Sequence, residues 1–411
     1  MLDWIRIRNS FLSVLPDRYT CPRALNNRER AQIAHKKDVS ASPNGKNWTS
    51  YNGDYSGQRY SNLNGINTTN VSHLRAAWIF HAENTSRLEV TPLVYNGVMY
   101  VTAANTMSAL DARTGPELWK HETCVSGGLI DDAAAHKNRG VGLWKNRVYM
   151  ETDNAHLLCL DGRSGRVLWD VTYADSRKSY GATGAPLVVK DQVIVGTSGG
   201  DSGVCGFLAA YDAESGRLGW KFWTIPAPGK PGSASWPGEA YLHSGLIPTS
   251  EGTRICPGIE GATNWYSPSY NPETRMFYFL ALENCNIFFS KPTVYKEGAT
   301  YYSTGTKKIQ TEPQQKILLA YSIPDGTLTW RYPQVGKGAS WEGTLATAEG
   351  WYFFGDDTGS FAAVDARTGH PLWEFNTGQT FRASPMSYEV DGLQYVAIAA
   401  GSDVISFSLP H

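Results

Sequence analysis

The sequence predicts an all-β protein, a β-propeller of four-stranded blades with tryptophan-docking motifs. The phrase Ala-Leu-Asp-Ala-Arg-Thr-Gly-Pro-Glu-Leu-Trp at 109–119 recurs along the chain, in copies that end at Trp169, Trp220, Trp330 and Trp373. A repeat of this length indicates an array in which each unit buries one face on its neighbour. The composition agrees, because 41 glycines and 14 tryptophans in 411 residues suit a turn-rich protein with packed indole rings.

Each copy reads as a strand, a tight turn and a second strand. The Asp and Gly positions suit the turn, because Gly adopts positive φ and Asp bonds its own backbone. The tryptophan then falls on the closing strand, where its ring can pack against the next unit and its N–H needs an acceptor.

A second hairpin precedes each copy. In the first unit, residues 88–94 and 98–101 flank Asn96-Gly97, the strongest short hairpin signal. Four strands in about 45 residues make one propeller blade. A repeated helix–turn–helix is the alternative, but these segments alternate with period two and carry Gly throughout. Comparable turns occur at Lys145-Asn146, Lys190-Asp191, Glu349-Gly350 and Asp391-Gly392.

Six blades are visible. Their closing tryptophans are separated by 50, 51, 110 and 43 residues from Trp119 onward, so one interval is anomalous. The strand at 74–80, which carries Trp78, precedes any full hairpin set, and the last strands of the chain lack a closing tryptophan. We therefore expect the early strand to complete the last blade and protect both sheet edges.

Charge and hydropathy exclude some partners. The net charge of −1 gives no electrostatic footprint for nucleic acid, and no apolar run is long enough for a membrane span. Residues 1–47 are polar and mildly basic, which predicts a poorly structured leader or an upstream extension of the reading frame, with no apolar core of signal-peptide type. The propeller is expected to occupy residues 48–411.

The six cysteines show no CxxC pair and no Cys/His cluster with zinc spacing. Cys124, Cys159 and Cys205 are expected to be buried free thiols.

Several motifs together resemble the quinoprotein alcohol dehydrogenases that depend on pyrroloquinoline quinone (PQQ), a family of eight-bladed propellers. The resemblance runs from about Trp48 to Leu409. Its carriers are Tyr51-Asn-Gly-Asp with Arg59-Tyr-Ser, Asn138-Arg139-Gly140, Thr183-Gly-Ala-Pro, Gly196-Thr-Ser-Gly-Gly-Asp-Ser-Gly-Val, Gly258-Ile-Glu-Gly-Ala-Thr-Asn-Trp-Tyr-Ser-Pro, Trp341-Glu-Gly-Thr-Leu-Ala-Thr-Ala and Gln394-Tyr-Val-Ala-Ile-Ala-Ala-Gly.

The resemblance implies a cofactor site on the ring axis. In the family, PQQ lies between a floor tryptophan and two adjacent cysteines, and polar groups bond its carboxylates and quinone oxygens. An arginine suits such a carboxylate, because its guanidinium binds in a bidentate manner. The residues that stand where the family binds its cofactor are Glu89, Arg139, Thr183, Ser198, Asn264 and Trp341.

The resemblance also implies chemistry and partners. A calcium ion polarises the quinone as a Lewis acid, and Asp201 stands at or beside the position of one ligand. A small alcohol gives a hydride to PQQ, and electrons pass to a cytochrome c or quinone. Family members work in the periplasm or are secreted.

Two departures bear on activity. Ala133-Ala134 stands where the family has its adjacent cysteines, and about two blades of family sequence are missing near 244–247. The floor tryptophan, a calcium-binding Asn and the catalytic Asp belong to the missing part, so the catalytic residue is unknown. Asp132, Asp201 and Glu260 are candidates only by residue type.

The departures leave two functions open. One is a PQQ-dependent alcohol dehydrogenase, and the other is a non-catalytic PQQ-like propeller that binds a partner or is a degenerate relative. An error in the gene model at the seam is a third explanation for the missing sequence. We further expect from the resemblance a Cys256–Cys285 disulfide. Six blades in place of eight predict a strained or imperfectly closed ring, weakest between the blade closed by Trp220 and the blade that ends at Trp330.

Overall fold

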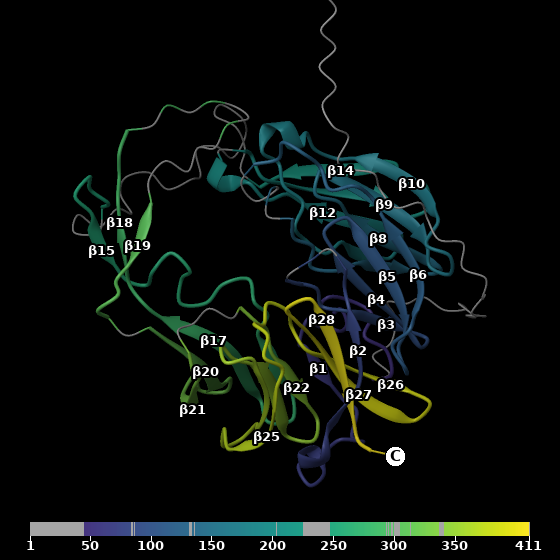
Figure 1. Ribbon diagram of the computed structural model, residues 1–411, viewed down its shortest axis with the longest axis vertical. Helices are drawn as coiled ribbons and strands as arrows, with labels where there is room; N and C mark the ends of the chain where they lie inside the picture. The colour runs from purple at the N-terminus through teal and green to yellow at the C-terminus, as the bar shows by residue number, and fades with distance from the viewer. Residues whose placement is uncertain are drawn as a thin grey trace, which may run out of the picture.

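The computed structural model describes residues 45–410, apart from positions 84, 86, 131–133, 135, 203, 225–246, 293, 295, 297–298, 300–304, 313 and 337–340 (Figure 1). Most of the expected leader, 1–44, therefore lies outside the described residues. The described chain is all-β, as predicted, and its strands form seven sheets.

Six of the sheets contain a four-stranded antiparallel blade, as expected from the six closing tryptophans. In Figure 1 the fourth strands β6, β10, β21 and β25 lie on the outside, and β8, β17 and β22 lie farther in. The first three blades comprise β3 (Leu93–Tyr95), β4 (Val98–Ala103), β5 (Thr106–Asp111) and β6 (Glu117–Glu122); β7 (Gly142–Trp144), β8 (Arg147–Glu151), β9 (His156–Asp161) and β10 (Val167–Thr172); and β11 (Leu187–Val189), β12 (Gln192–Gly196), β13 (Phe207–Asp212) and β14 (Leu218–Trp223).

The other three blades follow the anomalous interval. They comprise β16 (Ser269–Asn271), β17 (Met276–Glu283), β20 (Gln315–Ser322) and β21 (Leu328–Pro333); β22 (Leu345–Thr347), β23 (Trp351–Gly355), β24 (Ser360–Asp365) and β25 (Pro371–Asn376), with β1 (Tyr60–Ser61) parallel to β22; and β26 (Met386–Val390), β27 (Leu393–Ala400), β28 (Asp403–Ser408) and β2 (Arg75–His81). Short 3₁₀ turns are η1 (Val71–His73), η2 (Ser176–Lys178) and η3 (Gly200–Ser202).

The last blade closes as the sequence predicts, because β2 pairs antiparallel with β28. Its Trp78 donates its indole N–H to the carbonyl of Ala112 in the next blade, at 3.2 Å. The ring is joined on the other side by Trp373, whose indole N–H bonds the carbonyl of Leu74 at 3.2 Å. Closure by strands from both ends of the chain is confirmed.

Tryptophans dock on glycines of the neighbouring blade. A methyl group at Gly115 would lie only 2.9 Å from the Trp78 ring, so the ring can pack here only because glycine has no side chain. The same holds for the pairs Trp119–Gly165, Trp169–Gly216 and Trp330–Gly369. We call these residues the docking tryptophans and docking glycines; all four glycines have positive φ, which the turn requires. The repeated phrase thus encodes both halves of each blade interface.

Within the part of the chain that the structure describes, one interface of this kind is missing. Trp220 on β14 is 40% exposed, whereas Trp78, Trp119 and Trp330 are buried. Gly326, the glycine of the β20–β21 turn, has open space within 4 Å of where a side chain would stand. In Figure 1, β14 and β21 lie on either side of a sector in which the described residues form no four-stranded blade, and we call it the open sector. Among the described residues, the boundary at which the sequence predicts the weakest contact therefore has no docked tryptophan.

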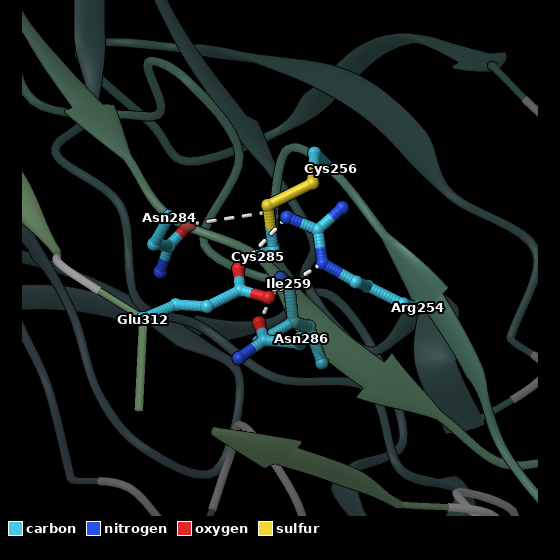
Figure 2. Close-up of a disulfide and its surroundings, with 8 residues drawn as sticks. Arg254, Cys256, Ile259, Asn284, Cys285, Asn286 and Glu312 are labelled. Carbon is cyan, nitrogen blue, oxygen red and sulfur yellow. Dashed lines mark hydrogen bonds and ion pairs between the residues drawn. A yellow bond between two sulfur atoms is a disulfide. The ribbon is translucent and has the colours of Figure 1, made fainter. Parts of the chain in front are cut away.

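A small sheet of β15 (Thr253–Ile255), β18 (Asn286–Phe288) and β19 (Thr306–Lys308) lies near this sector. Ile255 pairs with Asn286, which places the adjacent residues Cys256 and Cys285 in a disulfide with Cα atoms 4.5 Å apart (Figure 2). The expected disulfide is confirmed. Of the expected free thiols, Cys159 is buried and free, and Cys205 is free and half-buried. Cys124 is exposed and disulfide-bonded, so that expectation was wrong.

A buried arginine holds two of the loops that lead into the blades. Arg59 Nε donates to the carbonyl of Thr344 at 3.0 Å, and Nη2 donates to the carbonyl of Pro385 at 2.6 Å. Burial lowers the pKa of Arg59 to about 10. Its carbonyl partners satisfy the buried guanidinium, so one side chain fixes the entries to β22 and β26.

Candidate functional site

The candidate site is built from the loops that precede the first strand of each blade. A residue three or four positions before that strand recurs as a charged or aromatic side chain, or as a hydroxyl. Because the first strands lie inward in the ring, these loops converge from different blades. Their residues are Glu89 before β3, Arg139 before β7, Thr183 before β11, Trp265 before β16, Trp341 before β22 and Arg382 before β26.

Arg139 connects three blades. Its Nη1 atom donates to both the carbonyl and the hydroxyl of Thr183, each at 2.9 Å, and Nη2 donates to Glu89 Oε2 at 2.9 Å. The guanidinium carbon lies 4.2 Å from the centre of the Trp265 ring, a cation–π distance. Three of the predicted cofactor residues therefore meet at one guanidinium.

The aromatic side of the site contains Trp265 and Trp341. Their ring centres are 6.2 Å apart at an interplanar angle of 44°. Tyr266 packs edge-on against Trp341 at 6.1 Å, and the guanidinium carbon of Arg382 lies 5.3 Å from the Trp341 ring. Two broad apolar faces are thus bordered by cations, an arrangement that suits a flat aromatic anion.

Positive charge exceeds negative charge around Glu89. Lys137 Nζ lies 4.0 Å from Glu89 Oε1, and burial together with Arg87 lowers the pKa of Lys137, while Glu89 opposes this shift. Burial and Arg87 also lower the pKa of Arg382. Arg87, Arg139 and Arg382 all lie close enough to Lys137 to disfavour its charged form, so this surface is favourable for an anionic ligand.

Two buried carboxylates, Glu342 and Glu151, bond other side chains near the site. Glu342, next to Trp341, bonds Lys316 Nζ at 2.6 Å, and both side chains are buried. Burial raises the pKa of Glu342, while Lys316 opposes the rise. Glu151 accepts the hydroxyl of Tyr173 at 2.7 Å, and burial raises the pKa of Glu151 to about 7. These pairs hold the neighbouring loops without taking part in the surface of the site.

The other predicted residues lie apart from this cluster, or their side chains are not described. Ser198 forms a backbone bridge with Gly181, beside the loop of Thr183, and its hydroxyl is buried. Asn264 is exposed, and its amide bonds the carbonyl of Glu260 at 2.9 Å. Asp201 belongs to η3, but its side chain is outside the described atoms, as is the whole of Asp132.

Glu260 is committed elsewhere, since it bonds Asn284 and lies 3.4 Å from Lys308. Within the described residues, no group of three or more His, Cys, Asp or Glu side chains is placed to hold a metal. No described helix is long and apolar enough to cross a membrane.

Sequence reasoning missed Lys137, Trp265 and Arg382 as parts of the site. The signal that could have found Trp265 and Arg382 is their place, a few residues before the first strand of a blade. Among the described residues, two buried polar atoms of the cluster have no protein partner, Nε of Arg139 and Nε of Arg87. Oγ of Ser198, beside the loop of Thr183, has none either. Such atoms need an acceptor or donor that a polar ligand can supply, so the residues fit a carboxylated aromatic cofactor.

Comparison with known proteins agrees with this geometry. The chain is 33% identical over 316 residues to the quinohemoprotein alcohol dehydrogenase ADH IIB of Pseudomonas putida, covering 73% of this chain and 41% of the relative. It is 26% identical over 521 aligned positions to the quinohemoprotein alcohol dehydrogenase of Comamonas testosteroni, covering 86% and 72%. The chain thus spans about two fifths of the length of the first relative.

A solved structure has the same fold. The quinohemoprotein alcohol dehydrogenase ADHIIG from Pseudomonas putida HK5 matches with a TM-score of 0.78 at 23% identity, covering 90% of this chain and 82% of that one. Residues 48–246 and 327–396, about two thirds of the chain, match the PQQ family described as glucose/ethanol/alcohol dehydrogenase, beta-propeller domain. The chain belongs to this family of PQQ dehydrogenase propellers.

Proposed function

We propose that this chain binds PQQ at the surface formed by Glu89, Arg139, Thr183 and Trp341. The observation that carries the proposal is the placement of Arg139, which is bonded to Glu89 and Thr183 and stacked on Trp265. A guanidinium held in this way has its remaining N–H groups in a fixed plane, and this geometry suits hydrogen bonds to a carboxylate. When bound, PQQ would supply a hydride acceptor for the oxidation of an alcohol.

The side chains have separate parts in this binding. Arg139 and Lys137 would neutralise carboxylates, and Trp341 with Trp265 would pack on the rings. The Ser198 hydroxyl would bond an oxygen of the cofactor. If calcium is bound, Asp201 is the residue proposed to hold it, through carboxylate oxygens of the kind calcium prefers. Asn264 would have to release its bond to Glu260 to take part.

We expect alcohol oxidation by this chain to be slow or absent, which favours the binding function. The family match stops at residue 246 and resumes at 327. The sequence resemblance predicts that the catalytic Asp of the family is lost at this seam. The alignment with the Comamonas relative spans 521 positions, more than the 411 residues of this chain, which supports a long gap. Loss of a general base costs about 10²–10⁴ in rate.

If the chain does oxidise alcohols, the reaction is proposed to follow the family pattern. A small alcohol would be the substrate, a cytochrome c or quinone would accept the electrons, and the periplasm would be the compartment.

Titration with PQQ, with and without calcium, tests the binding. Quenching of tryptophan fluorescence should saturate in the wild-type protein and weaken in Arg139→Ala. Arg331→Ala, an exposed arginine on β21, is the matched control and should bind as the wild type does. Equal quenching of all three proteins would contradict the proposed site. Dye reduction with short alcohols tests turnover separately: a rate above the protein-free control would restore the dehydrogenase function.

A further inference from the structure

At the open sector, two halves of a blade interface have no docking partner among the described residues. On one side, β14 presents the exposed side chains of Leu218, Trp220 and Phe222. On the other side, the turn between β20 and β21 presents Gly326, flanked by exposed Ile323 and Leu328. Apolar residues gathered on two sheet edges indicate association rather than solvation.

These two halves have the chemistry of the interfaces that the ring already contains. Docking tryptophans donate to the carbonyl three residues before the docking glycine: Trp78 to Ala112, Trp119 to Gly162 and Trp330 to Ala366, at 3.0–3.2 Å. The matching acceptor at the open edge is the carbonyl of Ile323. Trp220 instead donates to Gln192 of its own blade, at 3.3 Å.

Two isoleucines that differ from the residues at the matching positions of the other blades make the two open halves complementary. Tyr100, Tyr149 and Tyr278 lie under docking tryptophans and donate to the next blade, to the carbonyls of Gly162, Ala213 and Ala366. The register Ile194–Ala210–Trp220 matches Tyr100–Ala109–Trp119, so Ile194 replaces the tyrosine at the open edge. Ile323 stands where the other turns have Ala or Gly, and its side chain can fill the space that the tyrosine fills elsewhere.

We propose that the occupant of these edges is a second copy of this chain: Trp220 of one molecule docks on Gly326 of the next. The contact is heterologous, since two different surfaces meet, and it repeats an interface seen four times within the ring. Each molecule carries both halves, so one copy can add to the next in sequence. The ring edge then becomes an assembly surface.

Sedimentation velocity across a micromolar concentration series tests this proposal. The wild-type protein should shift from one chain to two or more as its concentration rises. Trp220→Ala removes the docking ring. Gly326→Ala adds a methyl group that is free of contacts in the single molecule but would lie under the partner's indole ring. Each variant should weaken association at least about tenfold, as for a central interface tryptophan.

Matched controls separate docking from folding. Gly350→Ala changes a glycine with a similar positive φ, +75° against +68°, and equally open surroundings, so it carries the same backbone cost. Ile79→Ala removes another exposed apolar side chain. Both controls should associate as the wild type does.

Mixing the two interface variants gives the sharpest result. The Gly326→Ala chain retains Trp220, and the Trp220→Ala chain retains Gly326. Their mixture should therefore form heterodimers through one intact contact, at concentrations at which each variant alone is a monomer because its association is weakened. A wild-type protein that is monomeric at every concentration would overturn the proposal, as would association that none of the substitutions weakens. Failure of the mixture to form heterodimers would also overturn it.

Discussion

The guanidinium of Arg139 lies over the ring of Trp265, 4.2 Å from its centre, although the two residues belong to blades far apart in the chain. The contact sets the plane of the guanidinium, and the bonds to Thr183 and Glu89 set its rotation within that plane. A planar fork is therefore presented in one orientation, which a flexible ammonium group could not reproduce.

Arg139→Lys should retain the positive charge and lose this geometry. We expect the affinity for PQQ to fall about tenfold or more, because a lysine cannot bond Thr183 and Glu89 while stacking on Trp265. Fluorescence titration measures the change, and Arg331→Lys on the outer face is the control. Unchanged affinity in Arg139→Lys would show that charge alone holds the ligand.

Glu151 should make stability depend on pH. Burial raises its pKa in the folded protein from 4.5 to about 7, so the folded state binds the proton more tightly than the unfolded state does. The stability gained in this way is complete below pH 4.5 and is lost as the pH rises through 7. Glu151→Gln should remove the loss and be up to about 3 kcal/mol more stable than the wild type at pH 8, with little difference at pH 4.5.

Urea unfolding at the two pH values measures this effect. Glu283→Gln, at an exposed carboxylate, is the control and should change stability similarly at both. A Glu151→Gln variant whose stability difference from the wild type is the same at pH 4.5 and pH 8 would show that Glu151 titrates normally.

The Cys256–Cys285 disulfide should stabilise the small sheet beside the open sector. It closes a loop of 29 residues, for which the chain-entropy model gives about 3–4 kcal/mol. Replacement of both cysteines by serine should lower the unfolding free energy by up to this amount, whereas Cys205→Ser, at a free thiol, should not. If the double variant unfolds at the same urea concentration as the wild type, the bond does not constrain the unfolded chain.

Hydrogen exchange should distinguish β14 from the other outer strands. β6 and β10 occupy the same place in their blades, but their tryptophans are docked on a neighbour, while Trp220 is not. At low protein concentration, amides of β14 should exchange at least about tenfold faster than those of β10, because opening β14 breaks no interface between blades. Equal protection of the two strands is the outcome that contradicts this.

The sequence predicted those parts of the fold that local signals encode. The Asn96-Gly97 turn has positive φ at both positions. Each repeated phrase became a hairpin, and its closing tryptophan is docked on a neighbouring blade in every copy except the one that ends at Trp220. The absence of a closing tryptophan in the last strands was enough to assign the 74–80 strand to the last blade. The pairing of Glu89 with Arg139 and Thr183 was not predicted, although all three were named, since it depends on loops from three blades meeting at one point.

Other features of the site could not be predicted from the sequence, because they depend on which of two neighbouring side chains the loop conformation directs into the site. Asn264 is followed by Trp265 in a tight loop, and its side chain is taken up by backbone groups of that loop, including the carbonyl of Glu260. Trp265 then takes the place over Arg139. The family resemblance indicated a polar contact at 264, but the loop conformation decided which of the two neighbours reached the site.

The pairing of β2 with β28 has a consequence for how the protein is made. His81 and Asp403 bond each other across 322 positions of sequence, so the ribosome synthesises one strand of the last blade long before the other. During that interval β2 has no strand to bond, and its edge is open to other chains or to a chaperone. The blade can be completed only after β28 (Asp403–Ser408) has emerged. Truncation a few residues from the end would therefore damage the first strands as much as the last.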